Sequence, residues 1–460
     1  MNDGDVHAIS VECPWFSSFR FLFINESFWF MRMSLSINAF FSLLFFYAIA
    51  MPFFHNKIGS AGILVVNGAL ILFIASFLLM CKRFTFSFEN SVHKKIGLLY
   101  LYPLLFFLFL IPVSMVFGLL FGGITIIERD FFELYRPILY ILVFLFGYMY
   151  FSKKDSVEYF EKLILAIFVI IVLFGLNHFF RIFDSISELY TKSHNIRTRR
   201  VSVPFVNPYD YAFFMTFFIY YFFIKFLYDR LVYLPFFLLS VVMFVLPQSR
   251  SVAAGFIVGF FLIMPLFLTY SGFKLKTFRI NSRLLFFYLF FIFLVISFIV
   301  SIPYLIENFS YLTGQFIRLL ESGEVGGSAG TRLEQFLFAL DKAIVNPFIM
   351  LFGNGPAKDE MEFVESIYNY FFYRYGLIGV ILYFHLLLLT LFFCFKIIKS
   401  LGYQSKSYAL FMAIFLWLMT IPLLSIGNNF TEQARTSFFY YMLLGLVAAS
   451  YYQIVIKKGN

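Results

Sequence analysis

The chain has 460 residues, of which 62% are hydrophobic and only 13% are charged, and its formal net charge is +10. Its mean hydropathy is +0.87. A soluble globular chain is about half apolar and about a quarter charged, so this chain has too few polar side chains to cover a surface that faces water. The composition therefore excludes a soluble globular protein. It also excludes a nucleic-acid enzyme, which would need a soluble basic domain.

The cysteines and histidines form none of the common disulfide or metal-binding patterns. Cys13, Cys81 and Cys394 are far apart and show no Cys-x-x-Cys spacing, so neither a disulfide framework nor a thiolate metal site is expected. The six histidines include no His-Glu-x-x-His pattern, which argues against a zinc hydrolase. The sequence therefore predicts no metal site and no cofactor.

Apolar runs long enough to cross a bilayer, about 20 residues each, recur along the chain. They predict an all-α polytopic membrane protein in which residues 1–460 form a single integral membrane domain. Lysines concentrate after predicted spans 2, 4, 8 and 10, which places these loops and both termini on the cytoplasmic side. The twelve predicted spans are 34–54, 61–80, 97–120, 134–151, 163–180, 209–228, 231–247, 252–271, 284–305, 375–397, 408–426 and 436–456.

Two long segments, 181–208 and 306–374, are expected on the outer side of the membrane. Arginine predominates over lysine on this side, although lysine alone would satisfy the charge rule for topology. A guanidinium group binds phosphate oxygens bidentately and stays charged when partly desolvated, and helix N-termini attract anions. These features predict a diphosphate-binding site; the alternative is that the arginines extend to lipid phosphates. The arginines near the outer starts of spans are Arg136, Arg200, Arg250, Arg374 and Arg435.

The large outer segment carries further candidate residues. The glycines that follow Glu324 suit either an anion-binding loop or a flexible tip. Helical spacing from Arg332 onward predicts a surface helix that is capped near Thr331 and ends at Asn346-Pro347.

Residues 362–374 are aromatic but too polar for the middle of a bilayer, so they predict a short helix at the outer interface. In this helix Glu365 and Tyr368 are suitable partners for sugar hydroxyl groups; the alternative is an aromatic belt. Asp210, at the start of the span 209–228, is a third acidic candidate. A neighbouring arginine would be its ordinary partner.

Short motifs between residues 200 and 380 resemble the O-antigen polymerase and ligase superfamily. They are Pro204-x-x-Asn207-Pro208, Gln248-Ser249-Arg250-Ser251, Gly330-Thr331-Arg332, Asn346-Pro347, Gly353-Asn354-Gly355, Glu365-Ser366-x-Tyr368 and Tyr375-Gly376-x-x-Gly379. Many spans with one late, large outer loop also fit this superfamily. The ligase branch typically carries a histidine in that loop, and segment 306–374 contains none, so the polymerase branch is favoured.

The resemblance implies a metal-independent glycosyltransferase of the GT-C type at the periplasmic face of the bacterial inner membrane. It would move a growing glycan from undecaprenyl diphosphate onto a second lipid-linked repeat unit. Its partners would be the lipid-linked oligosaccharide and the bilayer, and a chain-length regulator protein is a further candidate. A ligase that transfers glycan to lipid A core and a flippase for lipid-linked glycan remain alternatives.

The resemblance and the residue chemistry together assign candidate roles at the outer face. The candidate catalytic residues are Arg250 and Arg332, which neutralise the diphosphate, and Glu365 and Glu324, the first and second choices for the general base. The candidate substrate-binding residues are Arg136, Arg200, Asp210, Tyr368, Arg374 and Arg435.

Overall fold

The computed structural model describes residues 26–53, 60–83, 91–153, 155–265, 327–402 and 405–457, with a few isolated positions between 289 and 304. Within these residues the chain is helical and contains no strand. Seven of the described helices are long and apolar enough to cross a membrane, and four shorter apolar helices accompany them. An α-helical membrane protein is thus confirmed. The count of twelve spans stays a prediction, because the span at 284–305 lies largely outside the described residues.

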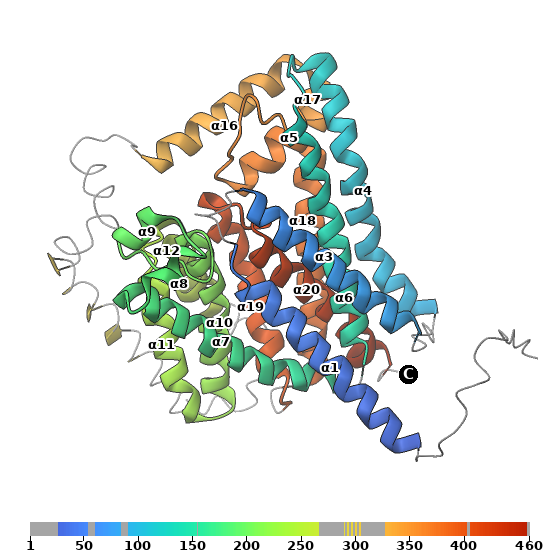
Figure 1. The fold of residues 1–460 in the computed structure, drawn as a ribbon, viewed down its shortest axis with the longest axis vertical. Coiled ribbons are helices and arrows are strands. Elements are labelled where there is room, and N and C mark those ends of the chain that lie inside the picture. Colours follow the sequence, from blue (N-terminus) through green and yellow to red (C-terminus); the bar gives the residue numbers. More distant parts are fainter. Residues whose placement is uncertain are drawn as a thin grey trace, which may run out of the picture.

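The apolar helices pack side by side into a bundle (Figure 1). The long ones are α4 (Ser91–Phe121), α6 (Tyr135–Phe151), α7 (Ser156–Phe180), α10 (Pro208–Tyr228), α18 (Ile367–Leu401), α19 (Tyr408–Leu424) and α20 (Ala434–Tyr451). The shorter apolar segments lie in α1 (Glu26–Ala50), α3 (Ser60–Arg83), α11 (Leu234–Val245) and α12 (Arg250–Val258).

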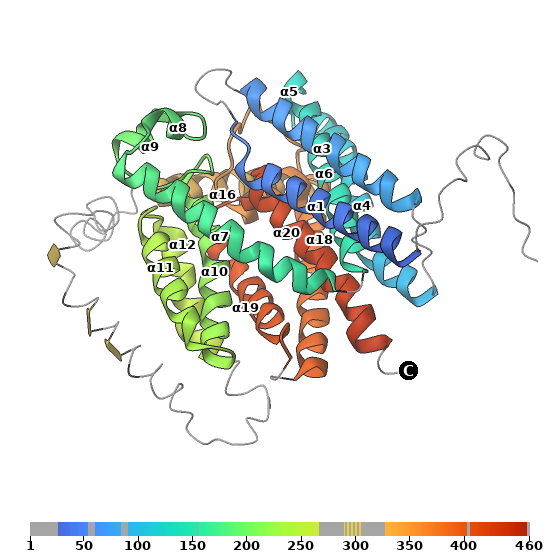
Figure 2. The same ribbon diagram turned by 60° about the horizontal axis from the view of Figure 1, so that its bottom comes forward.

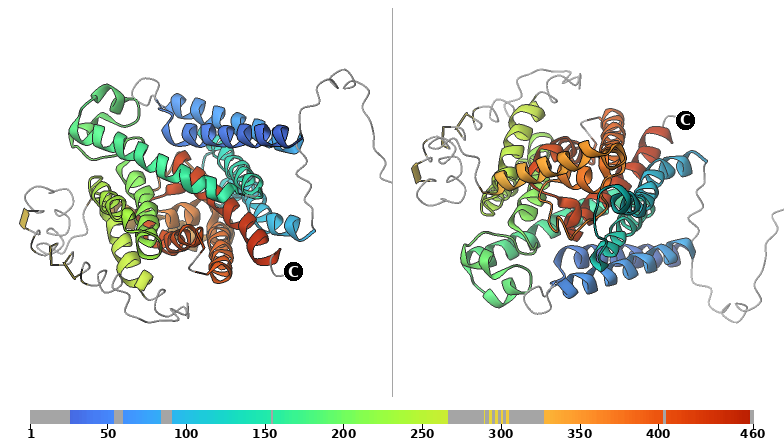
Figure 3. Two further views of the ribbon diagram at one scale, coloured as in Figure 1. Left: turned by 90° about the horizontal axis from the view of Figure 1, so that it is seen from below. Right: turned by 90° about the horizontal axis from the view of Figure 1, so that it is seen from above.

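One end of the bundle, which we call the capped end, is covered by additional helices. The long amphipathic helix α16 (Ser328–Val345) crosses it, and α17 (Pro347–Phe352) follows directly (Figures 1 and 3). The short helix α5 (Glu128–Phe131) lies beside them and leads through η2 (Phe132–Leu134) into α6. The surface helix predicted from Arg332 onward is therefore present, and it lies on one end of the bundle.

The ends of α16 differ in part from the prediction. Asn346 terminates the helix as predicted, and its side chain caps α17 by accepting a hydrogen bond from the Phe348 N–H at 2.9 Å. Thr331 is not the N-cap. It lies in the first turn, where its hydroxyl donates to the Gly327 carbonyl at 3.4 Å.

A break in α18 fixes the position of one predicted site residue. Gly376 has φ 63° and ψ −161°, a conformation that side-chain-bearing residues rarely adopt. The break exposes the carbonyls of Tyr373 and Arg374, which accept hydrogen bonds from the backbone N–H groups of Asn354 and Gly355 at 2.9 and 2.8 Å. The loop after α17 therefore holds the backbone at Arg374.

The short helix predicted within 362–374 is present, although it begins only at Ile367. The break at Gly376 separates it from the following span, which was expected from residue 375. The aromatic residues of this segment therefore form a short helix of their own before the span.

Among the described helices, α6 and α20 pack against each other most extensively. A Cβ added at Gly147 would lie 2.6 Å from the Met442 carbonyl oxygen, and one added at Gly445 would lie 2.5 Å from the Tyr148 nitrogen. Each glycine thus lets the other helix's backbone approach, as small residues do in membrane helix packing.

The helices α1 and α3 lie side by side on one flank, next to α7 (Figure 2). After α7, the predicted outer segment 181–208 contains the short helices α8 (Asp184–Glu188) and α9 (Ser193–Arg197). The buried His178 secures this segment, because its Nδ1 accepts the Ser202 N–H at 3.2 Å. This segment and the end of α1 lie at the capped end beside α10.

Candidate functional site

A buried carboxylate organises the capped end. Glu133, in η2, is 1% exposed and binds three cationic side chains. Its Oε1 lies 2.6 Å from Lys358 Nζ and 3.3 Å from Arg374 Nη1, and its Oε2 accepts a hydrogen bond from Arg136. A buried carboxylate needs such partners, because removing it from water costs several kcal/mol.

A second carboxylate completes this group, which we call the charged cluster: Glu133, Arg136, Lys358, Arg374 and Glu432. Glu432 Oε1 lies 2.8 Å from Arg136 Nη1 and 3.5 Å from Arg374 Nη1. The Tyr370 hydroxyl donates to Glu133 at 3.3 Å, and its ring lies 4.8 Å from the Arg374 guanidinium carbon. Three cations face two carboxylates, so the charged cluster retains one net positive charge.

Next to the charged cluster is a more accessible ion pair, the rim pair of Arg332 and Glu365. Arg332 Nε lies 3.0 Å from Glu365 Oε2, with side-chain exposures of 22% and 39%. Arg332 Nη2 also donates to the Gly427 carbonyl at 3.1 Å, and the Glu365 N–H donates to Gln335 at 3.2 Å. These contacts hold a guanidinium and a carboxylate together at a partly open position.

Gly427 brings the start of α12 to the rim pair. A Cβ at Gly427 would lie 2.4 Å from Ser251 Cβ and 3.0 Å from Arg332 Cζ. Ser251 and Arg332 therefore both lie close to Gly427. Arg250, the first residue of α12, directly precedes Ser251. The prediction that Arg250 and Arg332 belong to the same region is consistent with this packing.

A third group lies deeper, and we call it the polar floor: Asp210, Asn428 and Arg435. These side chains are 1%, 1% and 3% exposed. Asp210 Oδ2 accepts a hydrogen bond from Asn207 at 3.3 Å. No ion pair between Asp210 and Arg435 occurs among the described residues, so the expectation that a neighbouring arginine satisfies Asp210 is not met.

Arg435 is held by aromatic rings and by the end of α1. Its guanidinium carbon lies 4.1 Å from the centre of the Phe53 ring and 5.4 Å from that of Tyr190, and Nη2 donates to the Met51 carbonyl. Burial raises the pKa of the Tyr190 phenol, which donates to the Ala50 carbonyl at 2.6 Å. Within the part of the chain that the structure describes, no carboxylate forms an ion pair with the buried Arg435.

Tyr209 connects the three groups. Its hydroxyl interacts electrostatically with Asp210 of the polar floor, Glu432 of the charged cluster and both members of the rim pair. The groups thus belong to one region at the capped-end starts of α6, α10, α18 and α20.

Six of the ten predicted site residues meet in this region: Arg136, Asp210, Arg332, Glu365, Arg374 and Arg435. Arg250 borders it through Ser251. Arg200 and Tyr368 have other contacts, because Arg200 Nε donates to the Pro247 carbonyl at 3.3 Å and the Tyr368 hydroxyl donates to the Pro422 carbonyl at 2.7 Å. Glu324 lies outside the described residues.

The sequence reasoning missed Glu133, Lys358, Glu432 and Asn428. Glu133 precedes Arg136 by three residues, a spacing that places both on one helical face and could have revealed the pair. The other three depend on contacts between distant parts of the chain. Carboxylates neutralise most of the arginine charge at the capped end, and the predicted diphosphate-binding site did not include these partners.

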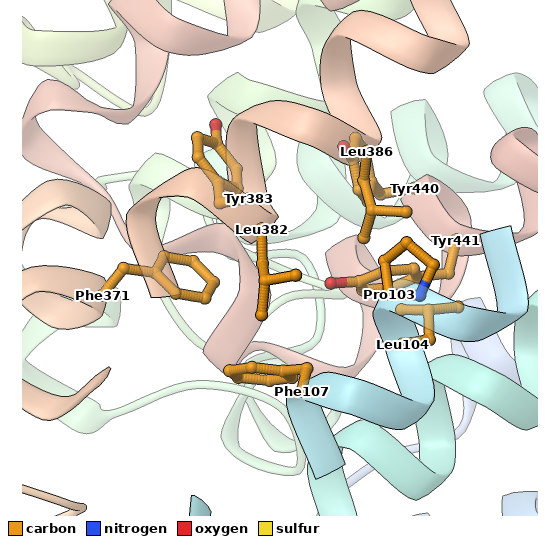
Figure 4. A pocket seen from close by; sticks show the side chains of 9 residues that line it. All are labelled: Pro103, Leu104, Phe107, Phe371, Leu382, Tyr383, Leu386, Tyr440 and Tyr441. Atoms are coloured by element: carbon orange, nitrogen blue, oxygen red, sulfur yellow. The ribbon is translucent and has the colours of Figure 1, made fainter. Parts of the chain in front are cut away.

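A small apolar cavity lies between α4, α18 and α20 (Figure 4). It is a narrow crevice with room for about one water molecule, because most of the about 340 Å³ of empty space around it is open to the outside. Phe371, which follows Tyr370, belongs to its wall. The lining residues are Pro103, Leu104, Phe107, Phe371, Leu382, Tyr383, Leu386, Tyr440 and Tyr441.

The described residues bring no three His, Cys, Asp or Glu side chains together in a way that could hold a metal ion. No protein-family model matches the chain, and a search of curated proteins found no significant match. The functional inference therefore depends on the chemistry of the chain's own residues.

Proposed function

We propose that the chain is a glycosyltransferase that joins lipid-linked glycans at the capped end, in the manner of an O-antigen polymerase. The donor would be a glycan on undecaprenyl diphosphate, the acceptor a second lipid-linked repeat unit, and the location the periplasmic face of a bacterial inner membrane. One observation carries the proposal: buried and half-buried arginines, carboxylates and amides converge at a single end of an apolar helix bundle. Ionisable groups are costly among membrane helices and mark functional sites by default.

The leaving group of such a reaction is a prenyl diphosphate. As the bond between the anomeric carbon and the diphosphate oxygen breaks, negative charge grows on the diphosphate. Arg332 is partly exposed and has donors available at the rim, and the net positive charged cluster lies behind it. Preorganised guanidinium groups can stabilise this charge without a metal ion.

The acceptor hydroxyl must lose a proton as it attacks the anomeric carbon. Glu365 suits the role of general base because its side chain is 39% exposed and its position is fixed by Arg332 and Gln335. A correctly placed general base typically contributes about 10²–10⁴-fold to the rate. Glu365 is a better candidate than Glu133, whose carboxylate is occupied by three cations.

A lipid-linked donor also needs an apolar path beside its diphosphate. The apolar crevice between α4 and α18 adjoins the charged cluster through Tyr370 and Phe371, and its walls would lie beside a prenyl chain whose diphosphate is bound at the capped end. This placement favours a lipid substrate over a soluble sugar nucleotide. The GT-C resemblance of the whole chain remains part of the proposal.

The proposal is tested in a strain that lacks this chain, by gel analysis of its surface polysaccharide. A single repeat unit on lipid A core is the result expected for a polymerase. No repeat on the core with accumulated lipid-linked polymer would indicate a ligase, and lipid-linked single repeats trapped on the cytoplasmic side would indicate a flippase. An unchanged chain-length ladder would contradict all three.

Complementation of that strain tests the site. Arg332→Ala should reach the membrane in normal amount but reduce chain growth by roughly 100- to 1,000-fold, as the loss of one transition-state donor does. Arg332→Lys should stay impaired, because lysine cannot reproduce the bidentate geometry. The matched control is Arg129→Ala at the same end, where an exposed ion pair with Glu362 is removed. Normal ladders from both Arg332 variants would disprove the assignment.

A further inference from the structure

The polar floor contains a concentration of buried polar atoms without hydrogen-bond partners among the described residues. They are Asp210 Oδ1, Asn428 Oδ1 and Nδ2, and Arg435 Nε and Nη1. The Asn428 amide lies close enough to Asp210 to interact with it, yet no hydrogen bond of normal geometry joins them. Buried polar groups in native proteins are nearly always satisfied, and leaving one unsatisfied costs about 1–3 kcal/mol. Such a set therefore indicates a missing partner.

The chemistry of these atoms restricts what that partner can be. Two are acceptors, on Asp210 and Asn428, and three are donors, on Asn428 and Arg435. A phosphate would satisfy the donors but meet the Asp210 carboxyl, and a cation would satisfy the acceptors but meet Arg435. A neutral ligand with adjacent hydroxyl groups suits both, because each hydroxyl donates one hydrogen bond and accepts others.

Partly exposed residues precede two members of the polar floor in the sequence. Asn207 and Tyr209, just before Asp210, are partly exposed, and Glu432, three residues before Arg435, is 18% exposed at its side chain. The rings of Phe53 and Tyr190 beside Arg435 add an apolar wall. Convergent polar groups next to aromatic walls are typical of small-molecule sites.

We propose that Asp210, Asn428 and Arg435 form a subsite that binds the hydroxyl groups of a neutral sugar residue of the glycan substrate. This inference rests on the proposed function and assigns the two chemical halves of the substrate to different groups. The rim pair and charged cluster receive the diphosphate, and the polar floor receives the sugar. Arg435 is thereby moved from the diphosphate to the sugar.

The test measures ligand stabilisation of the purified full-length protein in lipid nanodiscs by its thermal unfolding midpoint. The probes are farnesyl diphosphate and, separately, the oligosaccharide released by mild acid from lipid-linked intermediates of the source strain. Both should stabilise the wild type. Asp210→Asn and Asn428→Ser should weaken the oligosaccharide response at least tenfold in apparent Kd and keep the farnesyl diphosphate response. Arg332→Ala should show the reverse pattern.

Glu161→Gln is the matched control, because it also changes a buried carboxylate that has an unpartnered oxygen, at the opposite end of the bundle. It should keep both responses. If both polar-floor variants bind the oligosaccharide like the wild type, internal water satisfies these atoms and the inference is overturned. If farnesyl diphosphate alone stabilises the wild type, only the inference fails. If neither probe raises its thermal unfolding midpoint, the proposed function fails as well.

Discussion

The two ends of the bundle both bury charge, and they do so differently. At the capped end, the charged cluster joins three cations to two carboxylates. At the opposite end, Lys225 is 5% exposed and lies 2.7 Å from Glu161 Oε2 and 3.7 Å from Asp229 Oδ2. Lys225 Nζ also donates to the Lys406 carbonyl at 3.4 Å, so α7, α10 and the start of α19 are joined there.

The difference lies in what surrounds each group. The rings of Tyr221 and Tyr233 flank Lys225 at 5.8 and 5.9 Å, and its charge is fully balanced by carboxylates. The capped end has a charged cluster with one more cation than carboxylates, partly exposed members and the unpartnered atoms of the polar floor. Burial of charge alone is thus compatible with a structural connection, whereas surplus charge with unsatisfied neighbours indicates a ligand.

The largest expected effect concerns the central carboxylates of the two ends. Glu133→Gln should lower the free energy of unfolding by about 3–5 kcal/mol, because it leaves buried cations uncompensated. Glu161→Gln should cost less, since Lys225 keeps Asp229 and its ring contacts. Reversible unfolding in mixed detergent micelles measures both. Equal losses would remove the distinction between the ends.

Two glycines with positive φ allow the cost of backbone strain to be measured separately from the effect of a steric clash near the site. Gly376 and Gly402 both have positive φ, but a Cβ at Gly376 would lie 2.4 Å from the Leu351 carbonyl carbon, whereas nothing lies within 4 Å at Gly402. Gly402→Ala should therefore cost about 1 kcal/mol, the strain of the conformation alone. Gly376→Ala should cost about 3 kcal/mol and also reduce chain growth, because the loop that holds Arg374 must shift. Equal stability and activity in the two variants would show that the close contact does not matter.

The sequence allowed the helices and the surface helix to be predicted because these depend on local periodicity. Two motifs, Gly353-Asn354-Gly355 and Tyr375-Gly376, were recognised by resemblance, but only the structure reveals that they contact each other. The partners Arg136 and Glu432 are 296 residues apart, and spacing cannot predict such a pair. The missing hydrogen-bond partner of Asp210 likewise depends on which side chains surround it in the fold, and this cannot be predicted from the sequence.

The apolar cavity provides a third test of the capped end. Leu382→Trp fills the space next to the charged cluster, where overpacking costs about 1–3 kcal/mol. Turnover of a long-chain prenyl donor should fall by about tenfold, and turnover of a short-chain donor should fall less. Leu388→Trp on the same helix is the control, because Leu388 is 60% exposed. An equal effect of both variants, or an equal effect on both donors, would argue against a prenyl path.

The smallest effect is expected when the ion pair of the opposite end is replaced as a unit. The double variant Glu161→Leu/Lys225→Met removes both charges together, which in other buried pairs is neutral or slightly stabilising. Its free energy of unfolding should stay within about 1 kcal/mol of the wild type, and chain growth should be unchanged in the complementation assay. Loss of chain growth in a stable double variant would mean that this end also takes part in the reaction.

The mutual glycine contact of α6 and α20 has a mechanical consequence. With Gly147 and Gly445 against each other's backbones, these two helices form a stiff spine that cannot flex apart without losing its closest packing. Arg136 lies on α6 and Arg435 lies on α20, so the glycine contact farther along the two helices fixes the distance between these arginines. Any movement that admits a bulky substrate must then occur in elements outside this helix pair.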